Sequence, residues 1–322
     1  MRAVVHHRYG SPDVLELVEL EKPTPADDEV LVRVRATSVN AAEWYSLVSI
    51  PPMRVQMGLR RPKDPRLGAD FAGVVEAVGS ARTDFAPGDE VYGGRNGAFA
   101  EYVSVRDAIA PKPANLTFEQ AAAVPIAGIT ALQALRDHGR LSPGESVLVN
   151  GASGGVGTFS VQVAKALGAG QVTAVCSPRN VEQARSLGAD RVVDYTQHDF
   201  TRVEANRHDL LLDVAGGRSY GAIRRTLKPG GRFVMVGAPR GGRVLGPLGH
   251  IAKVKLASLG RIPKVAFFIA KLTRDDLLVL NEMLEAGTVT PVVERTYPLS
   301  EIADAMRLLG EGHARGKIVV TV

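Results

Sequence analysis

The sequence predicts an α/β protein in which a β-rich domain is joined to a domain built on a doubly wound parallel sheet. Two observations lead to this fold class. Residues 1–120 hold short apolar segments separated by Gly- and Pro-rich turns, which is typical of antiparallel strands. Residues 121–265 alternate strands with helices, and that rhythm predicts parallel strands with crossover helices. Residues 266–322 are expected to return to the first domain and complete it.

Three segments carry the β-rich character of the first domain. In residues 29–39, valines at every second position give the period of a half-buried strand. Residues 70–80 and 98–105 are predicted as further strands, and the turn-rich PGDEVYGG lies between them. Many short strands with Gly and Pro turns favour a compact, barrel-like domain.

The second domain is predicted from a regular succession of elements. The expected strands are 146–150, 171–176, 191–195, 209–216 and 232–237, and the expected helices are 158–168, 181–188 and one that ends at Leu227.

Two amphipathic helices and a strand are predicted near the carboxyl end. Thr273 with Asp276 forms a capping-box pattern ahead of the first helix. Ser300 is expected to cap the second helix and Gly310 to end it. The final KIVVTV is a predicted strand.

Composition narrows the class of protein. The chain has 322 residues, 45% hydrophobic and 23% charged, with a net charge of +5 that is scattered rather than gathered in a nucleic-acid-binding stripe. Its one cysteine, Cys176, excludes an internal disulfide and a cysteine zinc cluster. We expect a cytoplasmic protein without a signal peptide or a membrane span.

The glycine-rich segment 150–157, NGASGGVG, is the strongest functional signal. It follows a buried strand and precedes a helix, so small residues allow a pyrophosphate to approach the helix N-terminus. This context indicates a dinucleotide-binding Rossmann domain. After the second strand, Ser177 and Arg179 appear where NAD-preferring domains carry an acid. A hydroxyl and a guanidinium suit a 2′-phosphate, which predicts NADPH as the cofactor.

Several motifs together resemble one family. They are LGADFAGVVEAVG (67–79), PGDEV (87–91), NGASGGVGTF, LGADRVVDY (187–195) and HARGKIVV (313–320). The whole chain is similar to the zinc-independent branch of the medium-chain dehydrogenase/reductase superfamily, and within it to quinone oxidoreductases and reticulon-interacting mitochondrial members. The resemblance implies a GroES-like catalytic domain, a Rossmann domain and an active site in the cleft between them.

The same resemblance implies that no catalytic zinc is bound. Where zinc-dependent relatives have their first cysteine ligand and a nearby acid, this chain has Asn40 and Glu43, and their Gly-His-Glu corresponds to Gly68-Ala69-Asp70. Zinc needs several protein ligands, and these positions do not supply them. Without a Lewis acid, quinones and enones are favoured as substrates, because they delocalise the incoming charge of a hydride as phenolate or enolate.

The resemblance also assigns site residues. Asn40, Glu43 and Tyr45 are expected near the substrate, with Asn40 orienting a carbonyl and Tyr45 donating its hydroxyl. Alternatively, Tyr45 is a wall aromatic, Glu43 pairs with a basic neighbour, and Arg179 points to solvent. The expected cofactor contacts are Thr130, Ser153, Gly154, Gly155, Val156, Ser177, Arg179, Tyr195, Gly237 and Lys317, of which the last two lie along the nicotinamide half.

Three functions remain open at this point. The first is NADPH-dependent reduction of a small apolar quinone or enone, the second a redox-silent NADPH-binding protein, and the third an enoyl reductase acting on a carrier-bound thioester. Loops 45–66 and 240–272 are expected to form the substrate pocket. A homodimer is predicted through edge strands near residues 250–260. The basic, apolar segment 245–272 is expected to cap the pocket rather than to contact a membrane.

Overall fold

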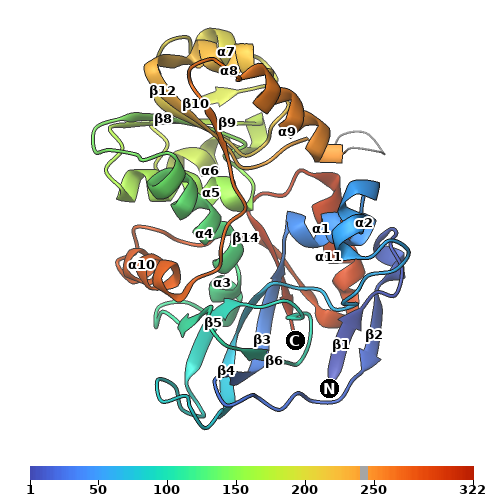
Figure 1. Cartoon of the computed structure of the whole chain (residues 1–322). Helices are drawn as coiled ribbons and strands as arrows, with labels where there is room; N and C mark the ends of the chain where they lie inside the picture. The colour runs from blue at the N-terminus through green and yellow to red at the C-terminus, as the bar shows by residue number, and fades with distance from the viewer. Residues whose placement is uncertain (240–245) are drawn as a thin grey trace. The chain divides into compact units, whose positions relative to one another are not determined.

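The computed structural model describes residues 1–239 and 246–322, and the chain forms two compact units (Figure 1). Unit 1 consists of Met1–Ile129, Lys271–Ala286 and Pro291–Val322. Unit 2 consists of Thr130–Ala270 and Gly287–Thr290. The boundaries predicted from the sequence lie slightly earlier, at residues 120 and 265. Helix α3 (Phe118–Ala122) explains the first difference, because it packs on strands of unit 1.

Unit 1 is built on a seven-stranded sheet in the order β14-β15-β3-β4-β5-β7, with β6 also paired to β3. The strands are β3 (Val30–Val39), β4 (Asp70–Val78), β5 (Glu90–Gly94), β6 (Tyr102–Val105), β7 (Ile109–Pro111), β14 (Val293–Pro298) and β15 (Lys317–Thr321). All of these pairs are antiparallel except β14 with β15. A separate hairpin joins β1 (Arg2–Val5) to β2 (Glu16–Glu19).

The sheet register of unit 1 brings segments distant in sequence into one place. Ile318 at the start of β15 lies opposite Val39 at the end of β3, and Ser38 lies opposite Asp70 at the start of β4. The helices of the unit are α1 (Ala41–Val48), α2 (Pro51–Met57), α3, the first part of α4 (Pro125–Gln133), α10 (Arg274–Glu285) and α11 (Ile302–Glu311), with short 3-10 turns at Pro12–Val14 and Leu299–Glu301. The end of β3, the start of β4 and the start of β15 therefore meet beside α1.

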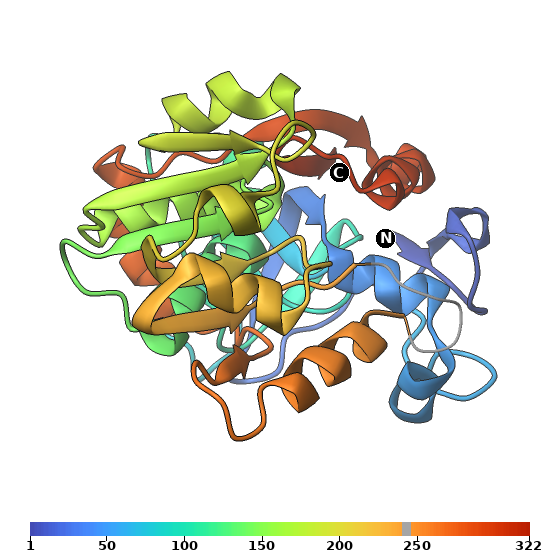
Figure 2. The same cartoon turned by 90° about the horizontal axis from the view of Figure 1, so that it is seen from above.

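Unit 2 is a six-stranded parallel sheet in the order β10-β9-β8-β11-β12-β13 (Figure 2). The strands are β8 (Ser146–Asn150), β9 (Gln171–Cys176), β10 (Arg191–Asp194), β11 (His208–Asp213), β12 (Leu227–Met235) and β13 (Val265–Phe267). Its helical segments are the end of α4, a π-turn at Ala134–His138, α5 (Gly155–Ala166), a 3-10 turn at Pro178–Asn180, α6 (Val181–Ser186), α7 (Phe200–Val203), α8 (Tyr220–Thr226) and α9 (Gly246–Ala257). The strands predicted between residues 146 and 237 are all present.

The strand predicted near residues 250–260 is wrong. Residues 246–257 form α9, and the edge of the sheet is β13, paired in parallel to β12. Good helix formers such as Ala, Leu and Lys fill this segment, and their helical preference outweighs the apolar content that suggested a strand. In the segment predicted as a cap, Phe267 belongs to β13 and the ring of Phe268 stacks on His138 at a centroid distance of 4.1 Å, and the cap role stays a prediction. Residues 240–245 of the predicted pocket loop lie outside the described part.

Two predicted helix ends are wrong near the carboxyl terminus, and one is right. The hydroxyl of Thr273 accepts a hydrogen bond from the Asp276 amide at 3.2 Å, as predicted. The second helix starts at Ile302 after a 3-10 turn, so Ser300 is not its cap. It ends at the left-handed Gly312, not at Gly310, which instead lies against Trp44: a Cβ there would be 2.4 Å from the indole ring. Among the described residues, no helix is long and apolar enough to cross a membrane.

Candidate cofactor and substrate sites

The glycine loop of unit 2 is a tight strand-to-helix turn. Strand β8 is wholly buried and passes into Gly151, whose φ of 87° favours glycine. Helix α5 begins at Gly155 with Gly154 as its N-cap residue. A Cβ on Gly157 would lie 2.0 Å from the carbonyl oxygen of Gly151. Glycine at these positions is therefore what allows α5 to start so close to β8.

The N-terminus of α5 is suited to an anion. Ser153, Gly154, Gly155 and Val156 are partly exposed there, and a Cβ on Gly154 would meet no atom within 4 Å. The first amides of a helix have no partner within the helix, and the helix dipole adds positive potential at this end. No acidic residue occupies the first turn of α5. These features fit the pyrophosphate of a dinucleotide.

Three of the predicted adenosine contacts follow neighbouring parallel strands. Ser177 comes directly after β9, and its hydroxyl accepts a hydrogen bond from Asn180 at 2.9 Å. Arg179 is exposed on the 3-10 turn that follows. Tyr195 comes after β10, is 47% exposed, and its amide donates to the Cys176 carbonyl at 3.2 Å. Because β9 and β10 are paired in parallel, these residues share one edge of the sheet.

The acids nearest to this edge are engaged by other groups. Asp194 ends β10, and its carboxylate accepts hydrogen bonds from the amide and hydroxyl of Thr196 at 2.9 and 2.8 Å. Glu182 is exposed and pairs with Arg185 at 2.8 Å. Arg179 and Ser177 therefore remain the groups that suit a 2′-phosphate at this edge.

Asp213 is a buried residue that the sequence reasoning did not single out. One carboxylate oxygen accepts hydrogen bonds from the Asn150 side chain at 2.7 Å and from the Gly216 amide at 2.8 Å. The other oxygen is buried and has no hydrogen-bond partner among the described residues. Burial raises the pKa of Asp213 to about 6. An acid that ends the apolar strand sequence DLLLD was the available signal for it.

Asp213 also helps to place Gly237. The Gly237 amide donates to the Asp213 carbonyl at 3.1 Å, and a Cβ on Gly237 would lie 1.9 Å from the Val214 carbonyl oxygen. The backbones that follow β11 and β12 are thus in close contact. Thr130, another predicted cofactor contact, lies partly buried in α4.

A buried polar cluster stands at the junction of β3, β4, β15 and α1 in unit 1. We call it the Lys317 cluster; its members are Ser38, Asn40, Glu43, Asp70 and Lys317, all buried. The Lys317 ammonium donates to the Asn40 side-chain oxygen at 2.5 Å and lies 3.2 Å from an Asp70 carboxylate oxygen. It also donates to the Val39 carbonyl at 3.3 Å. Lys317 is thus held within unit 1.

Asp70 is the hub of the Lys317 cluster. Its Oδ2 accepts hydrogen bonds from the Ser38 hydroxyl at 2.5 Å, the side-chain amide of Asn40 at 2.9 Å and the Lys317 ammonium at 3.2 Å. Its Oδ1 accepts one from the backbone amide of Ile126 at 2.9 Å. A buried carboxylate is costly unless it is paired in this way. The sequence reasoning considered Asp70 only as a former metal-ligand position.

Glu43 is buried on the first turn of α1 and titrates in an unusual range. Its carboxylate accepts a hydrogen bond from the backbone amide of Asn40 at 2.8 Å, as in a capping box. Burial and the charge of Asp70 raise its pKa to about 7, against the opposing effect of the Lys317 ammonium. Glu43 therefore binds a proton more readily than an ordinary glutamate does.

The geometry leaves Asn40 with little to offer a substrate. It is 7% exposed, its oxygen accepts from Lys317, and its amide nitrogen donates to Asp70. Its predicted role in orienting a substrate carbonyl stays a prediction, but its contacts with Lys317 and Asp70 are those of a positioning residue. Tyr45, one turn into α1, is partly exposed, whereas Asn40 is buried.

The Lys317 cluster does not fit a zinc ion. The resemblance implies that Asn40 stands at a cysteine-ligand position and Asp70 at the glutamate of Gly-His-Glu, and these two residues share a lysine ammonium between them. A cation that is part of the chain thus compensates the Asp70 charge. Across residues 1–239 and 246–322, no group of three His, Cys, Asp or Glu side chains is arranged to hold a metal.

Comparison with known families accounts for most of the chain. Residues 26–114 match the alcohol dehydrogenase GroES-like domain, and residues 187–320 match a family described as zinc-binding dehydrogenase. A mitochondrial NAD(P)H oxidoreductase of Mus musculus is 34% identical, over 100% of this chain and 89% of that protein. A chloroplast envelope quinone oxidoreductase homolog of Arabidopsis thaliana is 32% identical, over 99% of this chain and 98% of that protein. The chain belongs to the quinone oxidoreductase-like branch of the medium-chain dehydrogenase/reductase superfamily.

Solved structures agree with this membership. A quinone oxidoreductase from Coxiella burnetii superposes with a TM-score of 0.85 at 29% identity, covering 100% of this chain and 99% of that one. An Escherichia coli quinone oxidoreductase in complex with NADPH gives 0.80 at 26% identity, covering 100% of both chains. Another relative is an NADPH-dependent alkenal/one oxidoreductase of Arabidopsis thaliana, 33% identical over 99% of this chain and 79% of that protein. The predicted fold, a GroES-like domain with a Rossmann domain, is confirmed, and the chain is an oxidoreductase of this type.

Proposed function

We propose that this protein is an NADPH-dependent, zinc-free reductase that transfers hydride to a quinone or to the activated double bond of an enone. The observation that carries the zinc-free part is the Lys317 ammonium bound between Asn40 and Asp70. A cation supplied by the chain stands among residues that correspond to zinc ligands in other dehydrogenases. Replacing a metal in this way removes a Lewis acid and favours substrates that stabilise their own negative charge.

Unit 2 supplies the proposed cofactor site. The N-terminus of α5, with Ser153 through Val156, holds the pyrophosphate, and Ser177, Arg179 and Tyr195 hold the adenosine phosphate. When bound, the cofactor supplies the hydride. Gly237 and Thr130 line the nicotinamide half, where the close backbone approach at Gly237 leaves no room for a side chain. Two similar proteins support this choice of cofactor: the alkenal/one oxidoreductase of Arabidopsis thaliana is NADPH-dependent, and the Escherichia coli quinone oxidoreductase forms a complex with NADPH.

Unit 1 supplies the proposed substrate contacts. The Lys317 cluster fixes the first turn of α1, because Asn40 and Glu43 cap that helix and Lys317 and Asp70 hold Asn40. Tyr45 follows on the same helix and donates its hydroxyl to the oxygen that gains charge during hydride transfer. In this scheme Asn40, Glu43 and Lys317 position α1, and Tyr45 is the catalytic donor. We thus propose that Lys317 positions α1, whereas the sequence analysis expected it to contact the cofactor.

The direct test is NADPH consumption with a panel of quinones, enones and enoyl thioesters, after purification without chelators and with zinc determined in the same sample. We expect turnover with at least one conjugated acceptor and far less than one zinc per chain. Stoichiometric zinc, or turnover of simple alcohols with NAD⁺ only, would contradict the proposal. Tyr45→Phe should lower kcat with the best acceptor by about 10²-fold, the loss typical of one oxyanion donor.

Two further expectations belong to the same proposal. A homodimer is supported by the position of β13 at the edge of the sheet of unit 2, although the interface predicted at residues 250–260 is helical. A cytoplasmic location is supported by the single, buried Cys176, which suits a reducing compartment. Light scattering and fractionation test these two points.

A further inference from the structure

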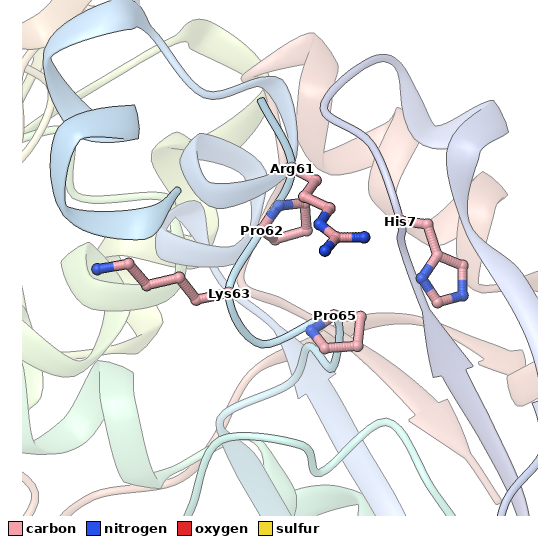
Figure 3. Close-up of a pocket in the computed structure, with 5 residues that line it drawn as sticks. All are labelled: His7, Arg61, Pro62, Lys63 and Pro65. Atoms are coloured by element: carbon pink, nitrogen blue, oxygen red, sulfur yellow. The ribbon is translucent and has the colours of Figure 1, made fainter. Parts of the chain in front are cut away.

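A basic pocket lies in unit 1, apart from the Lys317 cluster. Its lining residues are His7, Arg61, Pro62, Lys63 and Pro65, and its volume is about 450 Å³ (Figure 3). Figure 3 shows the side chain of Arg61 extending toward the strand that carries His7, while Lys63 extends in the opposite direction. The three polar lining residues are exposed, and none of them has an acidic partner within residues 1–239 and 246–322. We refer to this feature as the Arg61 pocket.

The charge of the Arg61 pocket is uncompensated. The one acid in its loop, Asp64, binds both the Nε and an Nη nitrogen of Arg66 at 3.0 Å, and it accepts a further hydrogen bond from Asn96 at 3.0 Å. The hydrogen bonds from Arg66 lower the pKa of Asp64, and its carboxylate binds residues that do not line the pocket. Arg61 and His7 therefore offer nitrogen donors, and no carboxylate lines the pocket among the described residues. A guanidinium with free donors is the group that binds phosphate best.

The walls of the pocket are fixed before any ligand arrives. Pro62 is buried, and the Pro65 carbonyl accepts a hydrogen bond from the His6 amide at 2.8 Å. The Tyr9 hydroxyl donates to the Gly58 carbonyl at 2.7 Å, which closes the loop from its other end. Because the prolines limit φ and these hydrogen bonds join the two walls, little entropy is lost when an anion binds.

The chain links the Arg61 pocket to the proposed substrate contacts. The Gly10 amide donates to the Leu47 carbonyl at 3.0 Å, which ties the His7 loop to the helix that carries Tyr45. Residues 61–65 lead within a few residues to Asp70, the hub of the Lys317 cluster. The pocket also lies within or beside loop 45–66, which the sequence assigned to substrate binding. A ligand held in the pocket is thus attached to the same unit as the substrate.

We propose that the Arg61 pocket binds the phosphate groups of a substrate tail, so that the substrate is an enoyl thioester of a phosphorylated carrier such as coenzyme A. The inference rests on the proposed reductase function and takes, among the acceptors that the sequence left open, the enoyl thioester. A free quinone or simple enone has no anionic group for Arg61 and His7, whereas a pantetheine carrier places its phosphates far from the reacting double bond. Hydride is added to the β-carbon, a solvent-derived proton to the α-carbon, and NADPH becomes NADP⁺.

The concave shape of the pocket favours a small phosphate ligand over a flat lipid surface. Val55 and Leu59 precede it and are 69% and 70% exposed, which would also suit contact with lipid. Vesicles of phosphatidylglycerol are therefore a separate arm of the test. Binding to such vesicles that depends on Arg61, without binding of coenzyme A, would overturn the proposal.

The first experiment measures binding without turnover. Coenzyme A is titrated calorimetrically into wild type, Arg61→Gln, His7→Gln and Arg60→Gln, each with saturating NADP⁺ so that the cofactor site is occupied. Arg60 is an exposed neighbour outside the pocket lining, and its variant is the matched control. We expect Arg61→Gln to weaken binding by about tenfold, the lower range for one charge-assisted contact, and Arg60→Gln to have little effect. Absent binding, or equal losses in Arg61→Gln and Arg60→Gln, would overturn the proposal.

The second experiment compares crotonyl-coenzyme A with the crotonyl thioester of N-acetylcysteamine, which lacks the phosphates. Arg61→Gln should raise KM for the first and leave kcat and the kinetics of the second unchanged. Turnover of quinones together with no Arg61-dependent binding of coenzyme A would refute the pocket assignment and leave the reductase function standing. Arg61-dependent binding with no reduction of any acceptor would refute the reductase function and leave the anion site standing.

Discussion

Replacing Lys317 by methionine removes the ammonium from the Lys317 cluster and keeps most of the side-chain volume. The side chain of Lys317 is 4% exposed and that of Asp70 is fully buried, so water does not replace the lost partner. Removing one partner of a buried ion pair costs about 3–5 kcal/mol, because the remaining charge stays buried. The Asn40 oxygen also loses its donor, but the two losses belong to one network and do not add. We expect Lys317→Met to lower the free energy of unfolding by about 4 kcal/mol.

Urea denaturation followed by tryptophan fluorescence measures the change in the free energy of unfolding, with the fluorescent side chain close to the Lys317 cluster. Trp44, the single tryptophan of the chain, lies on α1 directly after Glu43. The midpoint should fall while the slope m stays unchanged. Lys22→Met is the control, because Lys22 pairs with Glu76 on the surface at 2.6 Å and its loss should change little.

A double variant separates the ion pair from simple loss of packing. Lys317→Met combined with Asp70→Asn should be more stable than Lys317→Met alone, because the uncompensated charge is then gone. Equal destabilisation by Lys317→Met and Lys22→Met, or no recovery in the double variant, would refute the reasoning.

The remaining predictions concern pH, cofactor choice and the glycine loop. The pKa of Glu43 is raised from 4.5 to about 7 in the folded protein, so its contribution to stability is full below pH 4.5 and is lost as the pH rises through about 7. Glu43→Gln should remove this loss, which amounts to at most about 3 kcal/mol, and identical pH profiles of the unfolding free energy would contradict the assignment. Arg179→Ala should weaken NADPH by about 1.5–3 kcal/mol and NADH much less, as measured by fluorescence titration; equal losses would show that Arg179 does not contact the 2′-phosphate. Gly157→Ala should abolish cofactor binding or destabilise unit 2, since its Cβ would lie 2.0 Å from a carbonyl oxygen; wild-type affinity and melting temperature would argue against the tight turn.

Local patterns in the sequence predicted the elements of unit 2 well. Strands 146–150 and 171–176 coincide with β8 and β9, because a short apolar run between turn residues and an amphipathic helix has few other solutions. The glycine loop was recognised for the same reason, since both its spacing and its neighbours are local. The helix at residues 246–257 was missed, because its apolar residues are consistent with either period and only tertiary packing decides between them.

The Lys317 cluster shows what the sequence does not reveal. Asn40 and Asp70 are 30 residues apart, and Lys317 lies 247 residues beyond Asp70. Their contact depends on the register of β15 against β3 and of β3 against β4, which no periodicity in a single sequence specifies. The resemblance to a family therefore indicated Asn40, Glu43 and Lys317 one by one, with Lys317 expected along the nicotinamide half, but it did not indicate that they form one cluster. Asp213 was missed because its importance lies in a hydrogen bond with Asn150, which lies on the neighbouring strand but 63 residues away in the sequence.

Single-turnover transfer of label tests the central claim most directly. The protein is prepared with its zinc content measured and depleted by chelator, and it is loaded with NADPH that carries deuterium at both C4 positions of the nicotinamide. It is then mixed with a conjugated acceptor such as an enone or enoyl thioester. We expect deuterium at the β-carbon of the product from metal-depleted protein, at a rate that added zinc does not raise. No label in any product, or transfer that appears only when zinc is restored, would contradict a zinc-free NADPH-dependent reductase.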